Sequence, residues 1–191
     1  MANAHVRVLD SAIVGVVNDD HVPRDFGQTP ALPADKRDGV QTVDSAGSVG
    51  RFTSLALDAN GYPHISYYDD TNSSLKYACY DGSAWHTETA DSTRGGAWTS
   101  LALDDAGRPR ISYWSEYSLK YAWHDGTSWH TMVADLAGVY GVTSLALDSS
   151  GWPHISYHDM NEAALKYVRY DGTTWYSETV DSSGYFGYYS S

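Results

Sequence analysis

The chain has 191 residues, of which 42% are hydrophobic, and this is enough for one domain with its own core. Its formal charge of -12 excludes nucleic acid and anionic membranes as partners, because both require clustered lysine and arginine. Its one cysteine, Cys79, excludes an intrachain disulfide, and no apolar run is long enough to span a membrane.

The first 37 residues form a non-repeat N-terminal segment. The run HVRVLDSAIVGVVND predicts two strands, at residues 5–10 and 12–17, and a loop rich in proline, aspartate and glycine follows. The start has no basic region followed by an apolar run, so it is not typical of a signal peptide.

Residues 38–191 are built from internal repeats. Three nearly identical copies occupy residues 53–91, 99–135 and 143–181, and the second copy is shorter between Tyr113 and Leu119. A repeat of about 45 residues is typical of solenoids, propellers and arrays.

Each copy contains four short strand patterns. It opens with TSLALD, and a polar turn leads to a second strand that begins with proline. A polar loop, a third strand, an Asp-Gly hairpin turn and a fourth strand with a tryptophan complete it. Four antiparallel strands in about 45 residues make one blade of a β-propeller. We therefore predict an all-β β-propeller with three complete four-stranded blades; a flat β-solenoid array is the alternative.

The two ends of the repeat region predict how the ring closes. Residues 39–45 match the last strand of a blade, and residues 189–191 match the beginning of a first strand. In one closure, residues 5–45 supply three outer strands and residues 186–191 the inner strand of a four-bladed monomer. In the other, a homodimer forms one ring of about six blades. A third alternative is a fragment of a longer protein. Closure predicts that Tyr188 and Tyr189 are paired strand residues.

The run HISYYDDTNSSLKYACYDGSAWH resembles the blades of fungal and bacterial fucose-binding propeller lectins. Those blades pair a Tyr-Tyr strand with a strand that ends in an aromatic residue, Asp-Gly and a tryptophan. The DGSAW hairpin is similar to the Asp-box turn of sialidases, and the whole repeat is similar to that of many bacterial β-propeller proteins. The resemblance covers residue 40 to the C-terminus. It implies the fold and favours an extracellular or cell-surface location, which the residues themselves leave undetermined.

The ligand residues of that family are not matched here. Fucose-binding propellers use an arginine in the second strand and a glutamate in the third. The corresponding positions hold Ile65, Ile111, Ile155, Tyr77, Tyr121 and Tyr167. Fucose recognition is therefore not implied. Arg110 lies one residue from the arginine position, and strand alternation points it to the other face.

Positions that are the same in every copy are expected to be structural. Leu55 and Leu57 should fill the core. The second-strand tyrosines and fourth-strand tryptophans should pack between blades, and the repeated lysines should lie along the surface. These residues are Tyr67, Tyr113, Tyr157, Trp85, Trp129, Trp175, Lys76, Lys120 and Lys166.

A binding site is expected where the copies differ. In a propeller, the loop after the second strand and the connection between blades lie on the same face. Here they carry aromatic rings, which stack on sugars, and charged groups, which bind hydroxyls. The candidate ligand-binding residues are Tyr68, Asp69, Asp70, Arg94, Trp98, Trp114, Glu116, Tyr140, His158 and Asp159. The alternative is a polar, acidic loop surface without a ligand.

These features predict a non-catalytic, lectin-like protein that binds carbohydrate or another surface polymer. The alternatives are a structural or protein–protein interaction propeller without a small-molecule site and, third, a glycoside hydrolase or lyase. The sequence contains no Ser/His/Asp motif, Gly-rich phosphate loop or cysteine pair, so we predict neither enzymatic activity nor a cofactor. The repeated histidines spread around a ring rather than converge, so no metal site is expected.

Overall fold

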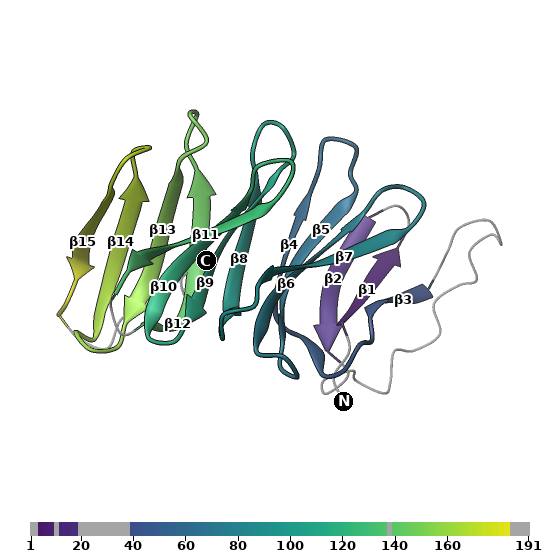
Figure 1. Cartoon of the computed structure of the whole chain (residues 1–191), viewed down its shortest axis with the longest axis horizontal. Coiled ribbons are helices and arrows are strands. Elements are labelled where there is room, and N and C mark those ends of the chain that lie inside the picture. Colours follow the sequence, from purple (N-terminus) through teal and green to yellow (C-terminus); the bar gives the residue numbers. More distant parts are fainter. Residues whose placement is uncertain (1–3, 10–11, 19–38, 137–138, 184–191) are drawn as a thin grey trace.

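The computed structural model describes residues 4–9, 12–18, 39–136 and 139–183, and these ranges contain β-strands and no helix. Twelve of the strands form three antiparallel four-stranded sheets, and β1, β2 and β3 form a smaller sheet. The sheets lie side by side along the long axis of the molecule (Figure 1). The prediction of an all-β chain with repeated, blade-like sheets is therefore confirmed.

The three larger sheets follow the repeats of the sequence. The first contains β4 (Val49–Leu57), β5 (Pro63–Asp69), β6 (Ser74–Tyr80) and β7 (Trp85–Asp91). The second contains β8 (Ala97–Leu103), β9 (Pro109–Ser115), β10 (Ser118–His124) and β11 (Trp129–Asp135). The third contains β12 (Val139–Leu147), β13 (Pro153–Asp159), β14 (Ala164–Tyr170) and β15 (Trp175–Asp181). Each is a simple meander, because consecutive strands are neighbours.

Local turn chemistry explains the meander. In the hairpin between β6 and β7, the backbone N–H of Asp81 donates to the carbonyl of Ala84 at 3.1 Å, and its carboxylate accepts from the N–H of Ser83 at 2.7 Å. In the turn between β4 and β5, the Asp58 carboxylate accepts from the N–H of Tyr62 at 2.8 Å. Aspartate stabilises such turns by bonding the backbone a few residues ahead.

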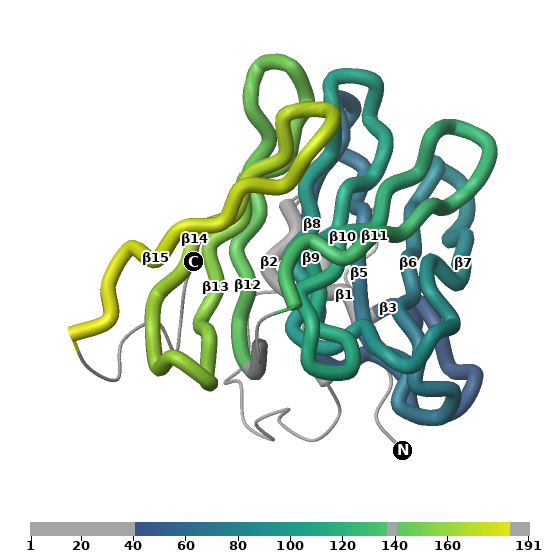
Figure 2. Tube along the Cα trace, turned by 60° about the vertical axis from the view of Figure 1, so that its left-hand side comes forward, coloured from purple at the N-terminus to yellow at the C-terminus, as the bar shows by residue number. Residues whose placement is uncertain are grey.

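The first strands β4, β8 and β12 lie next to one another. Figure 2 shows β8 and β12 in neighbouring sheets. Hydroxyl groups connect these sheets. Ser66 donates to the Thr99 hydroxyl at 2.7 Å, and Thr99 donates to the carbonyl of Phe52 at 2.8 Å. Ser112 and Thr143 make the same contact one sheet later, at 2.9 Å. The threonine that opens the second repeat and the one that opens the third therefore join their sheets to the previous one.

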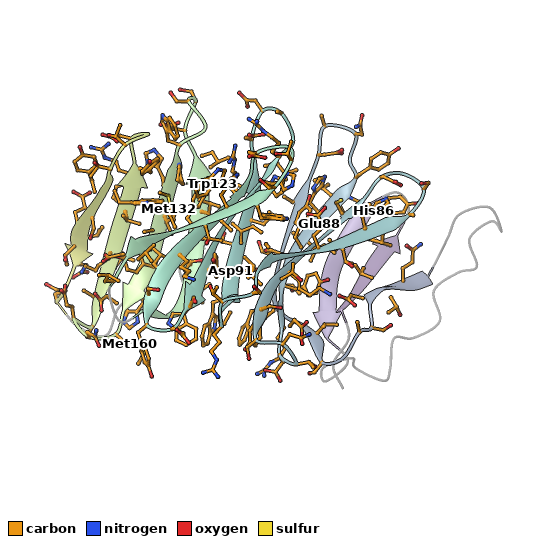
Figure 3. All side chains as sticks on the ribbon, in the orientation of Figure 1. His86, Glu88, Asp91, Trp123, Met132 and Met160 are labelled. Carbon is orange, nitrogen blue, oxygen red and sulfur yellow. The ribbon has the colours of Figure 1, made fainter. Side chains whose placement is uncertain are left out.

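An aspartate at the end of one sheet binds a tyrosine and a lysine of the next. Asp91, which lies between the first and second sheets, accepts from the Tyr113 hydroxyl at 2.5 Å and from the Lys120 ammonium at 3.1 Å (Figure 3). Burial alone would raise the pKa of Asp91, but these hydrogen bonds and those from Thr93 outweigh it and hold the pKa below its usual value. Asp44 binds Tyr67 and Lys76 in the same way.

These contacts correct the expectation for the lysines. The Lys76, Lys120 and Lys166 side chains are only 12%, 17% and 12% exposed, and each forms an ion pair with a buried aspartate. Lys166 differs from the other two, because its partner is Asp159 of its own sheet, at 3.1 Å. The lysines therefore connect or brace sheets rather than lie along the surface.

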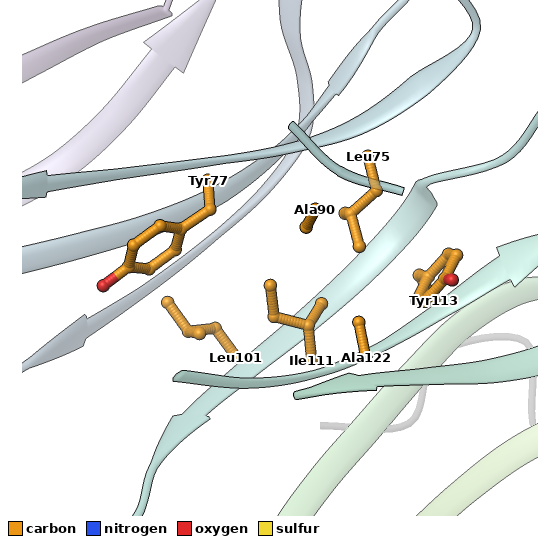
Figure 4. Close-up of a cluster of buried hydrophobic side chains, with 7 residues drawn as sticks. All are labelled: Leu75, Tyr77, Ala90, Leu101, Ile111, Tyr113 and Ala122. Carbon is orange, nitrogen blue, oxygen red and sulfur yellow. The ribbon is translucent and has the colours of Figure 1, made fainter. Parts of the chain in front are cut away.

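The core lies between the sheets. Leu75, Tyr77 and Ala90 of the first sheet pack against Leu101, Ile111, Tyr113 and Ala122 of the second (Figure 4). An equivalent cluster joins the second and third sheets. The second-strand tyrosines Tyr67, Tyr113 and Tyr157 are fully buried, as predicted.

One expected core residue is on the surface. Leu57 is 51% exposed, whereas Leu55 packs against the buried cluster of the first sheet. Leu57 is the last residue of β4 and pairs with Pro63, the first residue of β5. The sheet ends there, so no neighbouring sheet covers it.

The smaller sheet contains β1 (Ala4–Leu9), β2 (Ala12–Asn18) and β3 (Gly39–Asp44), in the order β2-β1-β3. These strands agree with the predicted ones. The pairing of β1 with β3 repeats that of the third and fourth blade strands: Ala4 pairs with Asp44 as Leu75 pairs with Asp91, and an irregularity follows in both. In addition, β2 contacts β4 as β5 contacts β8. Its strands thus correspond to the second, third and fourth strands of a larger sheet, although β1 precedes β2 in the chain.

Candidate functional site

A bulge in the first strand of two sheets creates the candidate site. In β4 the pairing with β5 skips from Arg51 to Ser54, and in β8 the pairing with β9 skips from Ala97 to Ser100. The skipped residues include Phe52 and Trp98, whose φ angles of 53° and 48° lie in the left-handed region. Aromatic residues rarely adopt this conformation, and such strain of about 1–3 kcal/mol is concentrated at functional sites.

Gly96 permits the close packing behind the second bulge. Its φ is 118°, and a Cβ at this position would lie 2.6 Å from the Cα of Leu75. Only glycine fits there, because the β6 backbone approaches this closely. The sequence Gly-Ala-Trp therefore brings Trp98 against the first sheet.

The bulges align aromatic rings across two sheets. The ring centroids of Phe52 and Trp98 are 4.6 Å apart, and those of Trp98 and Trp114 are 5.7 Å apart with the rings edge to face. Tyr68 extends the row at 6.2 Å from Phe52, and Tyr117 extends it at 6.4 Å from Trp114. The result is a continuous aromatic surface that runs from the first sheet to the second.

Charged groups border the aromatic row. The Arg51 guanidinium lies 5.2 Å from the centre of the Phe52 ring and 3.5 Å from the Asp70 carboxylate. Arg94 and Glu116 also line the cavity, and both have left-handed φ angles, of 37° and 42°. The cavity measures about 450 Å³. We call it the aromatic pocket; its lining is Arg51, Phe52, Tyr68, Ser73, Arg94, Gly95, Ala97, Trp98, Trp114 and Glu116.

The structure brings half of the sequence-predicted site residues into this pocket, namely Tyr68, Arg94, Trp98, Trp114 and Glu116. Asp70 lies beside it through its ion pair with Arg51. The candidate set omitted the other five lining residues, which are Arg51, Phe52, Ser73, Gly95 and Ala97. The position of Phe52 was detectable, because Phe52 and Trp98 occupy the same place in the repeat.

Three predicted residues are buried elsewhere. Asp69 is 3% exposed, and its carboxylate accepts from the backbone N–H and the side-chain amide of Asn72, at 3.1 and 2.7 Å. Asp159 is 2% exposed and pairs with Lys166. His158, at the repeat position of Tyr68 and Trp114, is 1% exposed. Asp69 and Asp159 therefore brace the ends of their second strands, and none of the three residues lines the aromatic pocket.

Tyr140 is the remaining predicted residue. Its backbone belongs to β12, and its side chain lies outside the described residues. Tyr188 and Tyr189, which were expected to be paired strand residues, also lie outside the described residues. Their predictions therefore stay predictions.

The pocket is lined by aromatic and charged side chains. Within the described ranges, no group of three or more histidine, cysteine or carboxylate side chains lies close enough to hold a metal ion. None of the described segments is a helix of the length and apolarity that a membrane crossing requires. What the pocket offers is aromatic surface with guanidinium donors and a carboxylate acceptor at its edge.

The chain matches no protein family model and none of the curated proteins with which it was compared.

Proposed function

We propose that this protein is a non-catalytic, lectin-like binding protein and that its aromatic pocket holds a carbohydrate unit. The observation that carries the proposal is the row Tyr68, Phe52, Trp98 and Trp114, held in place by strained backbone and bordered by charge. Aromatic faces cover the apolar face of a sugar ring, and Arg94 and Glu116 supply a donor and an acceptor for hydroxyls.

We further propose that the sheets are blades of a β-propeller. Two observations support this: the first strands of successive sheets are neighbours, and the smaller sheet has the register of a blade that lacks its first strand. Residues 186–191 align with the beginning of a first strand and are the candidate to complete it in a four-bladed monomer. The alternative remains a ring of about six blades formed by two chains.

The carbohydrate proposal is tested by glycan-array binding together with the intrinsic tryptophan fluorescence of the protein. We expect a saccharide to quench the fluorescence of the wild type. Trp98→Ala and Arg94→Ala should each weaken binding at the aromatic pocket at least about tenfold, which corresponds to about 1.4 kcal/mol. Tyr176→Ala serves as a control, because Tyr176 is 47% exposed on the third sheet and outside the pocket.

Other outcomes would support the other functions. A broad glycan panel without any response would contradict the proposal and favour a structural or protein-interaction role. The appearance of shortened oligosaccharides in the reaction mixture would favour a hydrolase or lyase.

A further inference from the structure

A second cavity lies between the second and third sheets. It is formed by the turns between first and second strands and by the hairpin between β14 and β15, whereas the aromatic pocket is formed at the opposite ends of the strands. In Figure 3, Trp123 and Met132 lie in the upper half of the molecule, and Met160, in the loop between β13 and β14, lies at the bottom. The cavity measures about 560 Å³, and we call it the middle-repeat cleft.

The cleft is lined by residues that distinguish the middle repeat from the other two. Four of its lining positions differ between the copies. In the first and third copies, the first of these positions holds tyrosine or tryptophan, the second histidine, the third cysteine or arginine, and the fourth glutamate. The middle copy carries Arg108, Arg110, Trp123 and Met132 at these positions, and all four line the cleft. The four exchanges fall together on the lining of one cleft, and this makes the cleft the candidate for a specialised site.

The two arginines are oriented before any ligand arrives. One oxygen of Asp104 accepts from Arg108 Nε at 2.8 Å and from Arg110 Nη2 at 2.7 Å. Its other oxygen accepts from the backbone N–H groups of Ala106 and Arg108, at 3.0 and 2.8 Å. Because the guanidinium groups are already held, a ligand loses less affinity to the ordering of these side chains.

Aromatic rings form the walls. Trp152 is 39% exposed, and its ring centroid lies 5.6 Å from that of Tyr170, edge to face. Trp123 and Tyr121 form a stacked pair on the other sheet, at 5.8 Å. Burial is the main cause that raises the pKa of Tyr121 to about 12, so its hydroxyl keeps its proton at neutral pH.

Met132 makes one wall apolar. At the previous interface, Glu88 occupies this repeat position and accepts from Trp129 Nε1 at 2.7 Å. Met132 offers no such acceptor, and Trp175 Nε1 is buried without a hydrogen-bond partner. The exchange removes a carboxylate from the cleft.

The charges of the lining cancel. Arg108 and Arg110 contribute two positive charges, and Asp104 and Asp105 contribute two negative charges. The cleft therefore does not select an anion. It combines fixed donors, acceptors and aromatic walls, which suit a neutral ligand rich in hydroxyl groups.

We propose that the middle-repeat cleft is a second binding site, for a neutral saccharide unit, and that it acts independently of the aromatic pocket. The chain then holds glycans at both ends of its sheets and links two glycan chains. The ligand class rests on the proposed function, whereas the existence of the site rests on the cleft itself.

The test introduces into the middle repeat residues that the first repeat already carries at the same positions. The double variant Arg108→Tyr/Arg110→His gives the middle repeat the residues of the first copy, Tyr62 and His64, so the sheet is expected to fold. An array of neutral, uronate-containing and sulfated glycans identifies the strongest neutral oligosaccharide. Isothermal titration calorimetry with that oligosaccharide then gives the number of sites in the wild type, the double variant, Trp98→Ala and their combination.

We expect two sites per chain in the wild type, one in the double variant, one in Trp98→Ala and none in the combination. One site that only Trp98→Ala removes would overturn the cleft proposal and leave the proposed function standing. One site that only the double variant removes would support the cleft and contradict the pocket. Binding restricted to uronate or sulfated glycans would contradict the neutral ligand class, and a complete absence of binding would contradict both proposals.

Discussion

At the scale of the residue, the second-strand tyrosines show how each sheet is connected to the one before it by a hydrogen bond. Tyr113 is fully buried, and its only polar atom on the side chain donates to the Asp91 carboxylate at 2.5 Å. The acceptor is charged and only 6% exposed, so the bond stabilises the interface more than a neutral pair would.

Tyr113→Phe keeps the ring and removes the hydroxyl. We expect the free energy of unfolding to fall by about 1.5–3 kcal/mol, because a hydrogen bond to a buried charge is lost. Denaturant titration measures the change. Tyr117→Phe is the control, since Tyr117 is 78% exposed, and it should change stability by less than about 0.5 kcal/mol. Equal effects of the two variants would contradict this role of Tyr113.

Met132 and Glu88 provide a second test, because they occupy the same position of the repeat but only Glu88 accepts a hydrogen bond from a tryptophan. Met132→Glu gives the buried Trp175 Nε1 an acceptor and should raise the free energy of unfolding by about 1 kcal/mol. Glu88→Met removes the hydrogen-bond acceptor of Trp129 and should lower the free energy of unfolding by a similar amount. Thermal unfolding of both variants shows whether stability rises in Met132→Glu and falls in Glu88→Met. A loss of stability in Met132→Glu would show that the methionine packing outweighs the hydrogen bond.

At the scale of the element, the sheets are joined by buried carboxylates, and this makes their association depend on pH. The folded-state pKa values of Asp44 and Asp91 lie below the usual value, because hydrogen bonds from lysine, tyrosine and the backbone outweigh the effect of burial. A group whose pKa is lowered by folding stabilises the folded state above its unfolded pKa of about 3.9. That stabilisation is lost as the pH falls through the folded-state pKa.

We therefore expect the denaturation midpoint to decrease as the pH is lowered from 6 to 3, most steeply below about pH 4. Asp91→Asn removes one of these carboxylates and should be less stable at pH 6 and less sensitive to acid. Asp105→Asn, at an exposed turn, should keep the wild-type slope. If Asp91→Asn and the wild type lose stability in parallel, Asp91 does not carry the pH dependence.

At the scale of the whole molecule, the third sheet has an outer face that none of the described elements covers. Val180 is 58% exposed, whereas Ala90 and Ala134, at the same repeat position, are 6% and 7% exposed because the next sheet covers them. An uncovered sheet face of this kind favours association with a further sheet. Ring closure would supply that sheet.

Light scattering after size-exclusion chromatography distinguishes the closures. We expect a monomer of 21.0 kDa, as the four-bladed ring requires. A dimer would instead support the ring shared by two chains. Larger or mixed species would contradict both closures.

The repeated elements could be predicted from the sequence because their signals are local. Strand alternation, a proline at the start of each second strand and Asp-Gly at each hairpin depend on neighbouring residues only, and β5, β9 and β13 form where these signals predict. The register of β1 with β3 had no such signal, since the N-terminal strands lack the residues of the repeat.

The sequence by itself determined the blade-like sheets and identified half of the aromatic pocket through the positions at which the copies differ. Only the tertiary structure decided which of those positions are accessible. Tyr68 and Asp69 are adjacent in the chain, but Tyr68 lines the pocket and Asp69 is buried against Asn72, because successive strand residues point to opposite faces. Likewise, Arg108 and Trp152 line one cleft because the packing of two sheets brings their turns together, and no local pattern encodes that arrangement.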